Sequence, residues 1–210
     1  MRTWQDNDPK ARVMERKRAA IVEAALQAFL GEGYAGSSVN RIAAQADVSI
    51  KTLYRHFDDK GDLFVAAIQK ACAPPAVEDT PAWFSAPPAE GLVVCGREHL
   101  AHILSPEQLA LYRVVARESP AFPELGRRYQ QDVVGSRIET FTGYLAVWPE
   151  PWRSRVADPT RAAHRYATLL SGELFEAVLL GGHTPTPDDL ERQARDAASD
   201  FLLLVEAGRL

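Results

Sequence analysis

The stretch 46–60, ADVSIKTLYRHFDDK, constrains the fold of this chain more than any other segment. Its apolar residues Val48, Leu53 and Phe57 recur at i, i+5 and i+9, so a helix formed here has only a narrow apolar seam to place against a core. Burial alone does not explain a helix of about seven to nine residues with so little apolar surface. The spacing therefore predicts a short helix that leaves most of its side chains at the surface.

The side chains outside this seam carry hydroxyls, a phenol, an imidazole and two cations. These groups suit a phosphate backbone and the edges of bases. They belong to Ser49, Lys51, Thr52, Tyr54, Arg55 and His56. We interpret the segment as the turn and recognition helix of a helix-turn-helix.

The preceding residues supply the first helix of that motif. Gly36-Ser37-Ser38 offers an N-cap, and Val39, Ile42, Ala43 and Ala46 then form one helical face. Two short helices joined by a turn of three or four residues form a helix-turn-helix. Asp47 falls in the turn, where a left-handed residue is often needed and which Asp tolerates better than most side chains.

At this point the chain resembles the DNA-binding domain of the TetR (TetR/AcrR) transcriptional regulators, over about residues 15–72. The matching residues are Glu32-Gly33-Tyr34, Ile42-Ala43, Val48-Ser49, Thr52-Leu53-Tyr54, His56-Phe57 and Lys60. The resemblance implies a three-helix DNA-binding unit, a connecting fourth helix, a helical ligand-binding domain and a homodimer. It also places Lys60 at a phosphate. Two positions depart from the family pattern. Asp47 replaces the usual turn Gly, and Asn40 stands where many relatives carry a basic phosphate contact, with Arg41 as a candidate substitute.

The expected DNA contacts combine this resemblance with the exposed helix face. Ser49, Tyr54 and Lys60 are expected to hold phosphates, whereas Lys51, Thr52, Arg55 and His56 are expected to face base edges or flanking phosphate. The complete predicted DNA-binding set is Ser38, Arg41, Ser49, Ile50, Lys51, Thr52, Tyr54, Arg55, His56 and Lys60.

The distribution of charge agrees with a DNA-binding part that is joined to a part without DNA contact. The chain of 210 residues has a formal net charge of −4, but residues 1–72 carry 11 Lys and Arg against 9 Asp and Glu. The remainder is acidic.

Two cysteines argue against a disulfide scaffold, and no apolar run or signal-peptide pattern points to a membrane or to export. We therefore expect a cytoplasmic protein.

Composition shifts divide the chain into four predicted segments. Residues 1–14 are expected to be a flexible basic arm, with a first helix from about Glu15 to Leu30, and residues 15–72 the helix-turn-helix domain. The prolines of 73–88 predict an irregular connection, whose Trp83-Phe84 needs cover from the second domain. Residues 89–210 form the predicted ligand-binding and dimerisation domain.

The expected fold class is all-α, because no segment alternates with period two. Breaks at Pro and Gly residues give predicted helices over 89–104, 106–118, 122–147, 160–180 and 187–207. Arg117-Glu118 and Phe122-Pro123-Glu124-Leu125 also resemble, more weakly, the ligand-binding domains of some TetR relatives.

Two long apolar stripes suggest a dimer interface. The first consists of Ala162, Tyr166, Leu169, Leu170, Glu173, Leu174, Ala177, Val178 and Leu180; the second consists of Ala194, Ala197, Ala198, Phe201, Leu202 and Val205. They could equally face the core of their own chain. Because the resemblance implies a dimer formed by the last two helices, we favour the interface.

Enzyme chemistry finds little support, since the chain has no nucleophile elbow, no phosphate-cradling Gly loop and no His-Glu-x-x-His. Cys95, His99 and His102 fall at i, i+4 and i+7 on one predicted helix, but a helix face with one Cys and two histidines explains them as well. We expect no metal, no cofactor and no catalytic residue.

The sequence therefore predicts a homodimeric DNA-binding regulator, a repressor that leaves a palindromic operator when a small organic ligand binds. The aromatic and apolar residues of the second domain favour an uncharged or weakly polar ligand. Two alternatives remain: control by a protein partner, and a helical-bundle enzyme or cofactor carrier in which the helix-turn-helix match is fortuitous.

Overall fold

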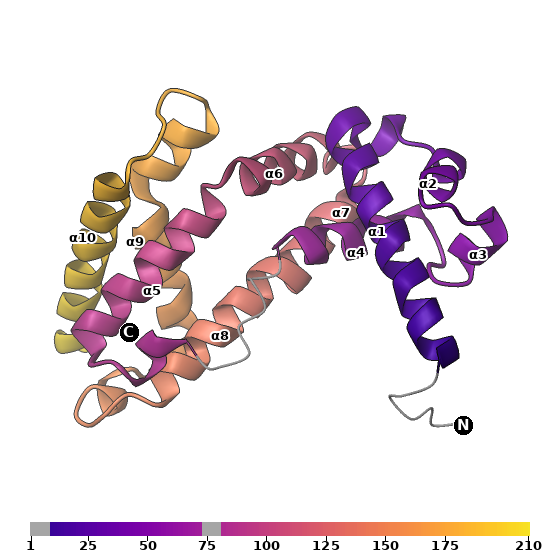
Figure 1. Cartoon of the computed structure of the whole chain (residues 1–210). Helices are drawn as coiled ribbons and strands as arrows, with labels where there is room; N and C mark the ends of the chain where they lie inside the picture. Colours follow the sequence, from indigo (N-terminus) through magenta and orange to yellow (C-terminus); the bar gives the residue numbers. More distant parts are fainter. Residues whose placement is uncertain (1–8, 73–80) are drawn as a thin grey trace. The chain divides into compact units, whose positions relative to one another are not determined.

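The computed structural model describes residues 9–72 and 81–210, and in these ranges its regular secondary structure is entirely helical (Figure 1). An all-α fold is therefore confirmed. The α-helices are α1 (Pro9–Gly36), α2 (Val39–Gln45), α3 (Ile50–Tyr54), α4 (Lys60–Cys72), α5 (Pro88–Ile103), α6 (Pro106–Glu118), α7 (Pro123–Arg128), α8 (Gly135–Ala146), α9 (Pro159–Leu179) and α10 (Pro187–Glu206). Short 3₁₀ segments lie at η1 (Ala82–Ser85) and η3 (Arg153–Arg155), and a π-helical segment, η2 (Tyr129–Val134), joins α7 to α8.

The chain forms two compact units. Of the described residues, the first unit contains 9–72 and 110–133, and the second contains 81–109 and 134–210. Residues 110–133, which the sequence assigns to the second domain, thus pack with the helix-turn-helix. No helix in the described ranges is both long and apolar enough to cross a membrane.

The core of the first unit lies between α1 and α4. Ile21 and Phe29 of α1 are at most 1% exposed, and Phe64 of α4 packs edge-on against Phe29 at a ring-centroid distance of 4.9 Å. Ile42 and Leu53 are completely buried and fix α2 and α3 to the same core. Of the apolar positions expected on α2 and α3 and in the turn, Ile42, Ala43, Leu53 and Phe57 are buried as predicted, whereas Val39, Ala46 and Val48 are only half-buried.

The first helix begins earlier than expected. Residues 9–14, predicted to belong to the flexible arm, form the first turns of α1, while residues 1–8 lie outside the described residues. Pro9 suits the first turn of a helix, and the Lys, Ala and Arg that follow it are good helix formers. The helix is interrupted at Gly33, whose φ of 76° lies in the left-handed region, where only glycine is unstrained.

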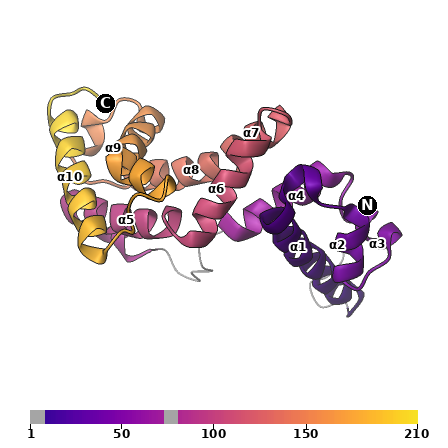
Figure 2. The same cartoon turned by 90° about the horizontal axis from the view of Figure 1, so that it is seen from above.

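In the second unit, α10 packs along α5 and α9, and α9 packs against α8 (Figure 2). Tyr166, Phe141 and Phe201 form its aromatic centre, with the Tyr166 and Phe141 rings stacked at 4.8 Å. Trp83, part of the segment expected to need cover, is 7% exposed and donates a hydrogen bond to Glu98 at 3.0 Å. Its docking on the second unit is confirmed.

The two apolar stripes of α9 and α10 face mainly the core of their own chain. Buried members of the two stripes include Ala162, Tyr166, Leu170, Ala194, Ala197, Ala198, Phe201 and Val205. For these eight side chains the predicted dimer contact is wrong, because α5 and α8 already cover them. For Leu174 and Leu202, which are half-buried, it stays a prediction. Other apolar residues of this pair stay accessible: Leu180, just beyond the end of α9, is 76% exposed, and Leu203 of α10 is 60% exposed.

Candidate nucleic-acid interface

The turn between α2 and α3 has the local geometry that the sequence predicts. Asp47 adopts a φ of 53°, and the Val48 N–H donates to the Ala43 carbonyl at 3.0 Å, which closes the turn. Ser49 then caps α3, since its Oγ accepts a hydrogen bond from the Thr52 N–H at 3.1 Å. The hydroxyls of Ser49 and Thr52 also share a hydrogen bond of 2.9 Å. These contacts fix both hydroxyls at the start of α3.

Buried side chains hold α3 on the first unit from one side only. Leu53 is completely buried and Phe57 is 5% exposed, and the guanidinium of Arg18 lies 5.4 Å from the centre of the Phe57 ring. The α-helix itself spans only five residues, fewer than predicted, although the Phe57 N–H still donates to the Leu53 carbonyl at 3.1 Å. The narrow seam therefore anchors the helix and leaves its other faces open.

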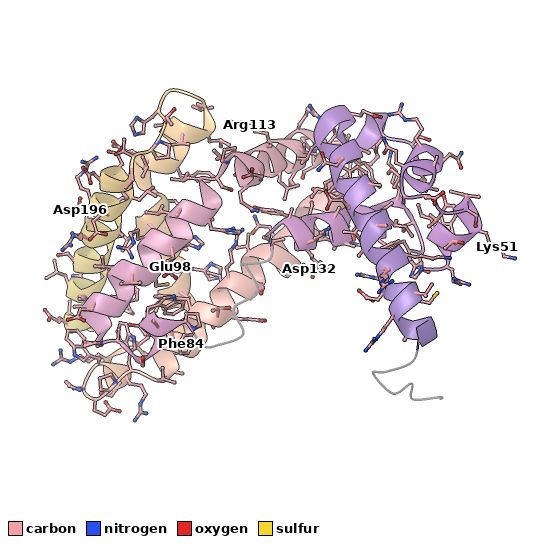
Figure 3. All side chains as sticks on the ribbon, in the orientation of Figure 1. Lys51, Phe84, Glu98, Arg113, Asp132 and Asp196 are labelled. Carbon is pink, nitrogen blue, oxygen red and sulfur yellow. The ribbon has the colours of Figure 1, made fainter. Side chains whose placement is uncertain are left out.

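Three side chains of α3 project from this anchored helix without a partner in the described part of the chain. Lys51 is exposed and points away from the first unit (Figure 3). Tyr54 is 50% exposed and Ile50 is 38% exposed. A cation, a phenol and an apolar contact on one accessible surface suit phosphate oxygens and base edges.

Arg55 and His56 are more constrained. The guanidinium of Arg55 lies 3.0 Å from the sulfur of Met14 on α1, although the side chain remains exposed. His56 is half-buried, and its Nε2 has no hydrogen-bond partner in the described ranges. Burial, then the positive charges of Arg55 and Arg18, lower the pKa of His56. A neutral imidazole beside two cations can still donate or accept one hydrogen bond.

The two DNA contacts predicted at α2, Ser38 and Arg41, differ in whether their side chains already have a partner within the chain. Ser38 is the N-cap residue, but its side chain makes no capping hydrogen bond, so the hydroxyl is available to a ligand. Arg41 forms an ion pair with Glu32, and its side chain is 59% exposed. An exposed ion pair of this kind contributes little stability, so a phosphate can replace Glu32 at small cost.

Lys60, at the start of α4, is partly occupied within the first unit. Its ammonium donates to the Ser37 carbonyl at 2.6 Å and lies 4.7 Å from the centre of the Tyr34 ring. Burial lowers the pKa of Lys60, and the charge of Glu118 opposes that change. An ammonium group has three N–H donors, so these contacts leave donors for a phosphate.

Residues of α6 and α7 also support the helix-turn-helix, which sequence reasoning missed. The carboxylate of Glu118, 8% exposed, accepts a hydrogen bond from the Ala35 N–H at 3.3 Å. Arg128 forms an ion pair with Asp62 of α4 at 2.6 Å. The sequence offered no signal for these pairs, because each joins residues more than 60 positions apart and neither follows a helical spacing.

The metal alternative gains no support from the second unit. No group of three or more His, Cys, Asp or Glu side chains able to hold a metal occurs in the described residues. Burial raises the pKa of the Cys95 thiol to about 12, so this sulfur stays protonated and is a poor metal ligand.

A short helix that is anchored on one side, carries free cationic and polar groups and follows a helix-turn-helix turn defines a helical DNA-binding regulator. A sequence model of the bacterial regulatory proteins of the tetR family matches residues 21–67. A model of the C-terminal domain of AefR-like transcriptional repressors matches residues 90–204. The chain belongs to the TetR family of transcriptional regulators and is not an enzyme.

Individual proteins show the same relationship. The chain is 27% identical over 185 residues to the HTH-type transcriptional repressor AcnR of Corynebacterium diphtheriae, a match that covers 85% of this chain and 88% of that protein. It is 38% identical over 60 residues to the HTH-type transcriptional repressor SCO4008 of Streptomyces coelicolor, which is 29% of this chain but only 31% of that protein.

Solved structures extend the likeness to nearly the whole chain. A putative TetR-family regulator from Mesorhizobium loti matches with a TM-score of 0.70 and 25% identity, covering 91% of this chain and 97% of that one. The flavonoid-responsive regulator FrrA matches with a TM-score of 0.71 and 28% identity, covering 90% of this chain and 96% of that one.

Proposed function

We propose that this protein is a homodimeric repressor that acts in the cytoplasm, binds a palindromic DNA operator and releases it when a small organic ligand binds. The observation that carries the DNA-binding part is the open surface of α3. There, Lys51 and Tyr54 are exposed and have no partner in the described part of the chain, while Leu53 holds the helix in place. The curated relatives AcnR and SCO4008 are named as repressors, which supports the sign of regulation.

The homodimer is supported by apolar surface that the second unit leaves uncovered. Leu180 and Leu203 are exposed, and Leu174, Phe175 and Leu202 near them in the chain are half-buried. All five belong to α9, its end or α10, which pack against each other. A two-fold pair of such surfaces makes a four-helix contact and removes these side chains from water.

The two-fold symmetry of a homodimer determines the arrangement of the operator, which must contain two half-sites in inverted orientation. Two copies of α3 enter successive major grooves when the half-sites are about 34–36 Å apart, or a multiple of this distance.

The ligand part of the proposal is supported by the likeness to FrrA, a regulator named as flavonoid-responsive. We also propose that Ser38, Arg41, Thr52 and Lys60 contact the operator DNA.

Selection of bound DNA from a random pool tests the operator claim. We expect the selected sequences to share an inverted repeat with a fixed centre-to-centre spacing. Sedimentation of the complex should then give two chains, or a multiple of two, for each duplex. Selected sequences without symmetry, bound by single chains, would refute the dimer and the palindrome together.

A further inference from the structure

The first unit contains a pocket of about 580 Å³ between the start of α4 and the start of α7, two helices that pack against each other. All of its lining residues belong to this unit. A volume of this size is typical of sites for small organic molecules. Of the proposed DNA contacts, Lys60 also lines the pocket, so the pocket adjoins the DNA-contacting surface.

Two aromatic rings form an apolar wall of the pocket. Tyr34, in the last turn of α1, and Phe122, just before α7, meet edge-on with their ring centres 4.8 Å apart. Phe122 is 37% exposed, in contrast to Phe29 and Phe64 of the core, which are 1% exposed. A planar aromatic molecule that packs against this wall removes apolar surface from water and makes ring contacts with it.

The charged side chains of the lining place both signs of charge on each side of the pocket. Asp59 and Lys60 lie at the start of α4, and Glu124 forms an ion pair with Arg127 on α7. A ligand with one charge therefore meets a like charge on either side. A neutral hydroxyl group can donate to a carboxylate and can also accept from an ammonium or guanidinium group, so it suits both sides.

Lys60 is the cation of the lining that has no carboxylate partner. Arg127 and Arg128 both pair with Glu124. Lys60 instead donates to a backbone carbonyl and lies against the face of the Tyr34 ring, and it forms no ion pair with any residue that the structure describes. Its remaining N–H donors can reach a hydroxyl oxygen in the pocket.

We propose that this pocket binds a neutral, planar diphenol, a molecule of two or three aromatic rings with a hydroxyl group at each end. Its rings pack against Phe122 and Tyr34, one hydroxyl meets the charged pair at the start of α4, and the other meets the charged pair on α7. Because Lys60 is also a proposed phosphate contact, the diphenol and the operator compete for one ammonium group. The site itself does not depend on the proposed function, whereas this competition rests on it.

The first test is calorimetric titration of the full-length protein, without DNA, with three biphenyls. The probes are 4,4′-dihydroxybiphenyl, 4-hydroxybiphenyl and biphenyl-4,4′-dicarboxylate. We expect the dihydroxy probe to bind at least about tenfold more tightly than either of the others, because each loses a hydrogen bond to a charged group or meets a like charge. Absent binding of the dihydroxy probe, or binding of the dicarboxylate with equal or higher affinity, would overturn the proposal.

Gly61→Leu fills the pocket, and Gly31→Leu is its matched control. A Cβ on Gly61 would lie 3.0 Å from the Asp59 carboxylate and 3.7 Å from the Tyr34 hydroxyl, and all three residues line the pocket. A Cβ on Gly31, an exposed residue of α1 in the same unit, meets nothing within 4 Å. Both glycines lie in helices and neither has a positive φ, so the backbone accepts Leu at each position.

We expect Gly61→Leu to lower the affinity for the dihydroxy probe at least about tenfold, and Gly31→Leu to leave it unchanged. Phe122→Ala removes one ring of the wall and should also weaken the probe, which keeps the test decisive if Gly61→Leu fails to fold. Thermal unfolding of each variant identifies misfolding. An undiminished affinity in folded Gly61→Leu, or in folded Phe122→Ala, would overturn the site.

The competition at Lys60 is measured with operator DNA. We expect the saturating dihydroxy probe to weaken operator binding by the same factor by which the operator weakens probe binding. An operator affinity that the probe leaves unchanged would refute the competition. If the probe binds and Gly61→Leu blocks it but the protein binds no DNA, the proposed function fails and the site stands. If the protein binds its operator and no probe, the site fails and the DNA-binding function stands.

Discussion

The burial of His99 predicts how the stability of the second unit depends on pH. The folded-state pKa of about 4 lies below the ordinary value of 6.5, because burial and the neighbouring Arg137 and His102 oppose the charged form. The unfolded chain therefore binds more protons than the folded chain between pH 6.5 and 4. Stability must fall as the pH falls through this window, and His99 has no such effect above it.

The magnitude follows from the two pKa values. At about 1.36 kcal/mol per pKa unit, protonation of the unfolded state lowers the free energy of unfolding by about 2 kcal/mol between pH 7.5 and pH 5. Most carboxylates titrate below this range, so they contribute little to the change. His56, whose pKa is also lowered, contributes to the wild-type slope, and the comparison must isolate His99.

Urea unfolding of the wild type and of His99→Gln at pH 7.5 and pH 5 makes this comparison. Trp83, Trp148 and Trp152 all lie in the second unit, so their fluorescence reports mainly its unfolding. We expect the loss of stability at pH 5 to be about 2 kcal/mol smaller in His99→Gln than in the wild type. Equal losses in the two proteins would refute the reasoning, because His99 would then titrate normally in the folded state.

Further predictions concern DNA binding, the turn and the dimer. Lys51→Ala should relax sequence preference and cost about 1–3 kcal/mol of binding free energy if a base contact is lost. Lys60→Ala should weaken binding to all DNA sequences and reduce the slope of log affinity against log salt concentration by about one. Fluorescence anisotropy with operator and scrambled DNA at several salt concentrations separates the two effects. Asp47→Gly should raise the free energy of unfolding by up to about 1 kcal/mol in urea titrations, because the φ of 53° is unstrained for glycine. Leu203→Arg should give folded monomers in sedimentation, since this side chain is 60% exposed, whereas Phe201→Arg should unfold the protein, since Phe201 is completely buried. A folded Phe201→Arg monomer or a dimeric Leu203→Arg would contradict the assignment of these two residues.

Local signals in the sequence predicted most of the helices. Prolines mark where this helix begins and where it must end, so the expected segment 106–118, which starts at Pro106 and stops before Ser119-Pro120, coincides with α6. The start of α1 was missed because residues 9–14 lack apolar periodicity, which is needed for packing but not for the helix itself. Periodicity also revealed Leu53 and Phe57 as anchors, since two apolar residues in a polar segment have few other roles.

The sequence could not predict which segment packs against each apolar helix face, or which group pairs with each charged side chain. The α10 stripe around Phe201 fits a neighbouring chain as well as its own core, and only the position of α5 decides between them. Glu118 meets the backbone of Ala35 across 83 residues, and Lys60 meets the Ser37 carbonyl. Such contacts depend on tertiary geometry, which no local pattern encodes.

Photo-crosslinking to the selected operator tests most directly that α3 is the DNA-contacting element. A photo-reactive phenylalanine analogue replaces Lys51 in one variant and Asp196, an exposed residue of α10, in the control. We expect crosslinks from position 51 to bases inside each half-site of the operator, and none from position 196. No crosslink at position 51 in a protein that still binds the operator, or equal crosslinking from both positions, would contradict DNA recognition by α3.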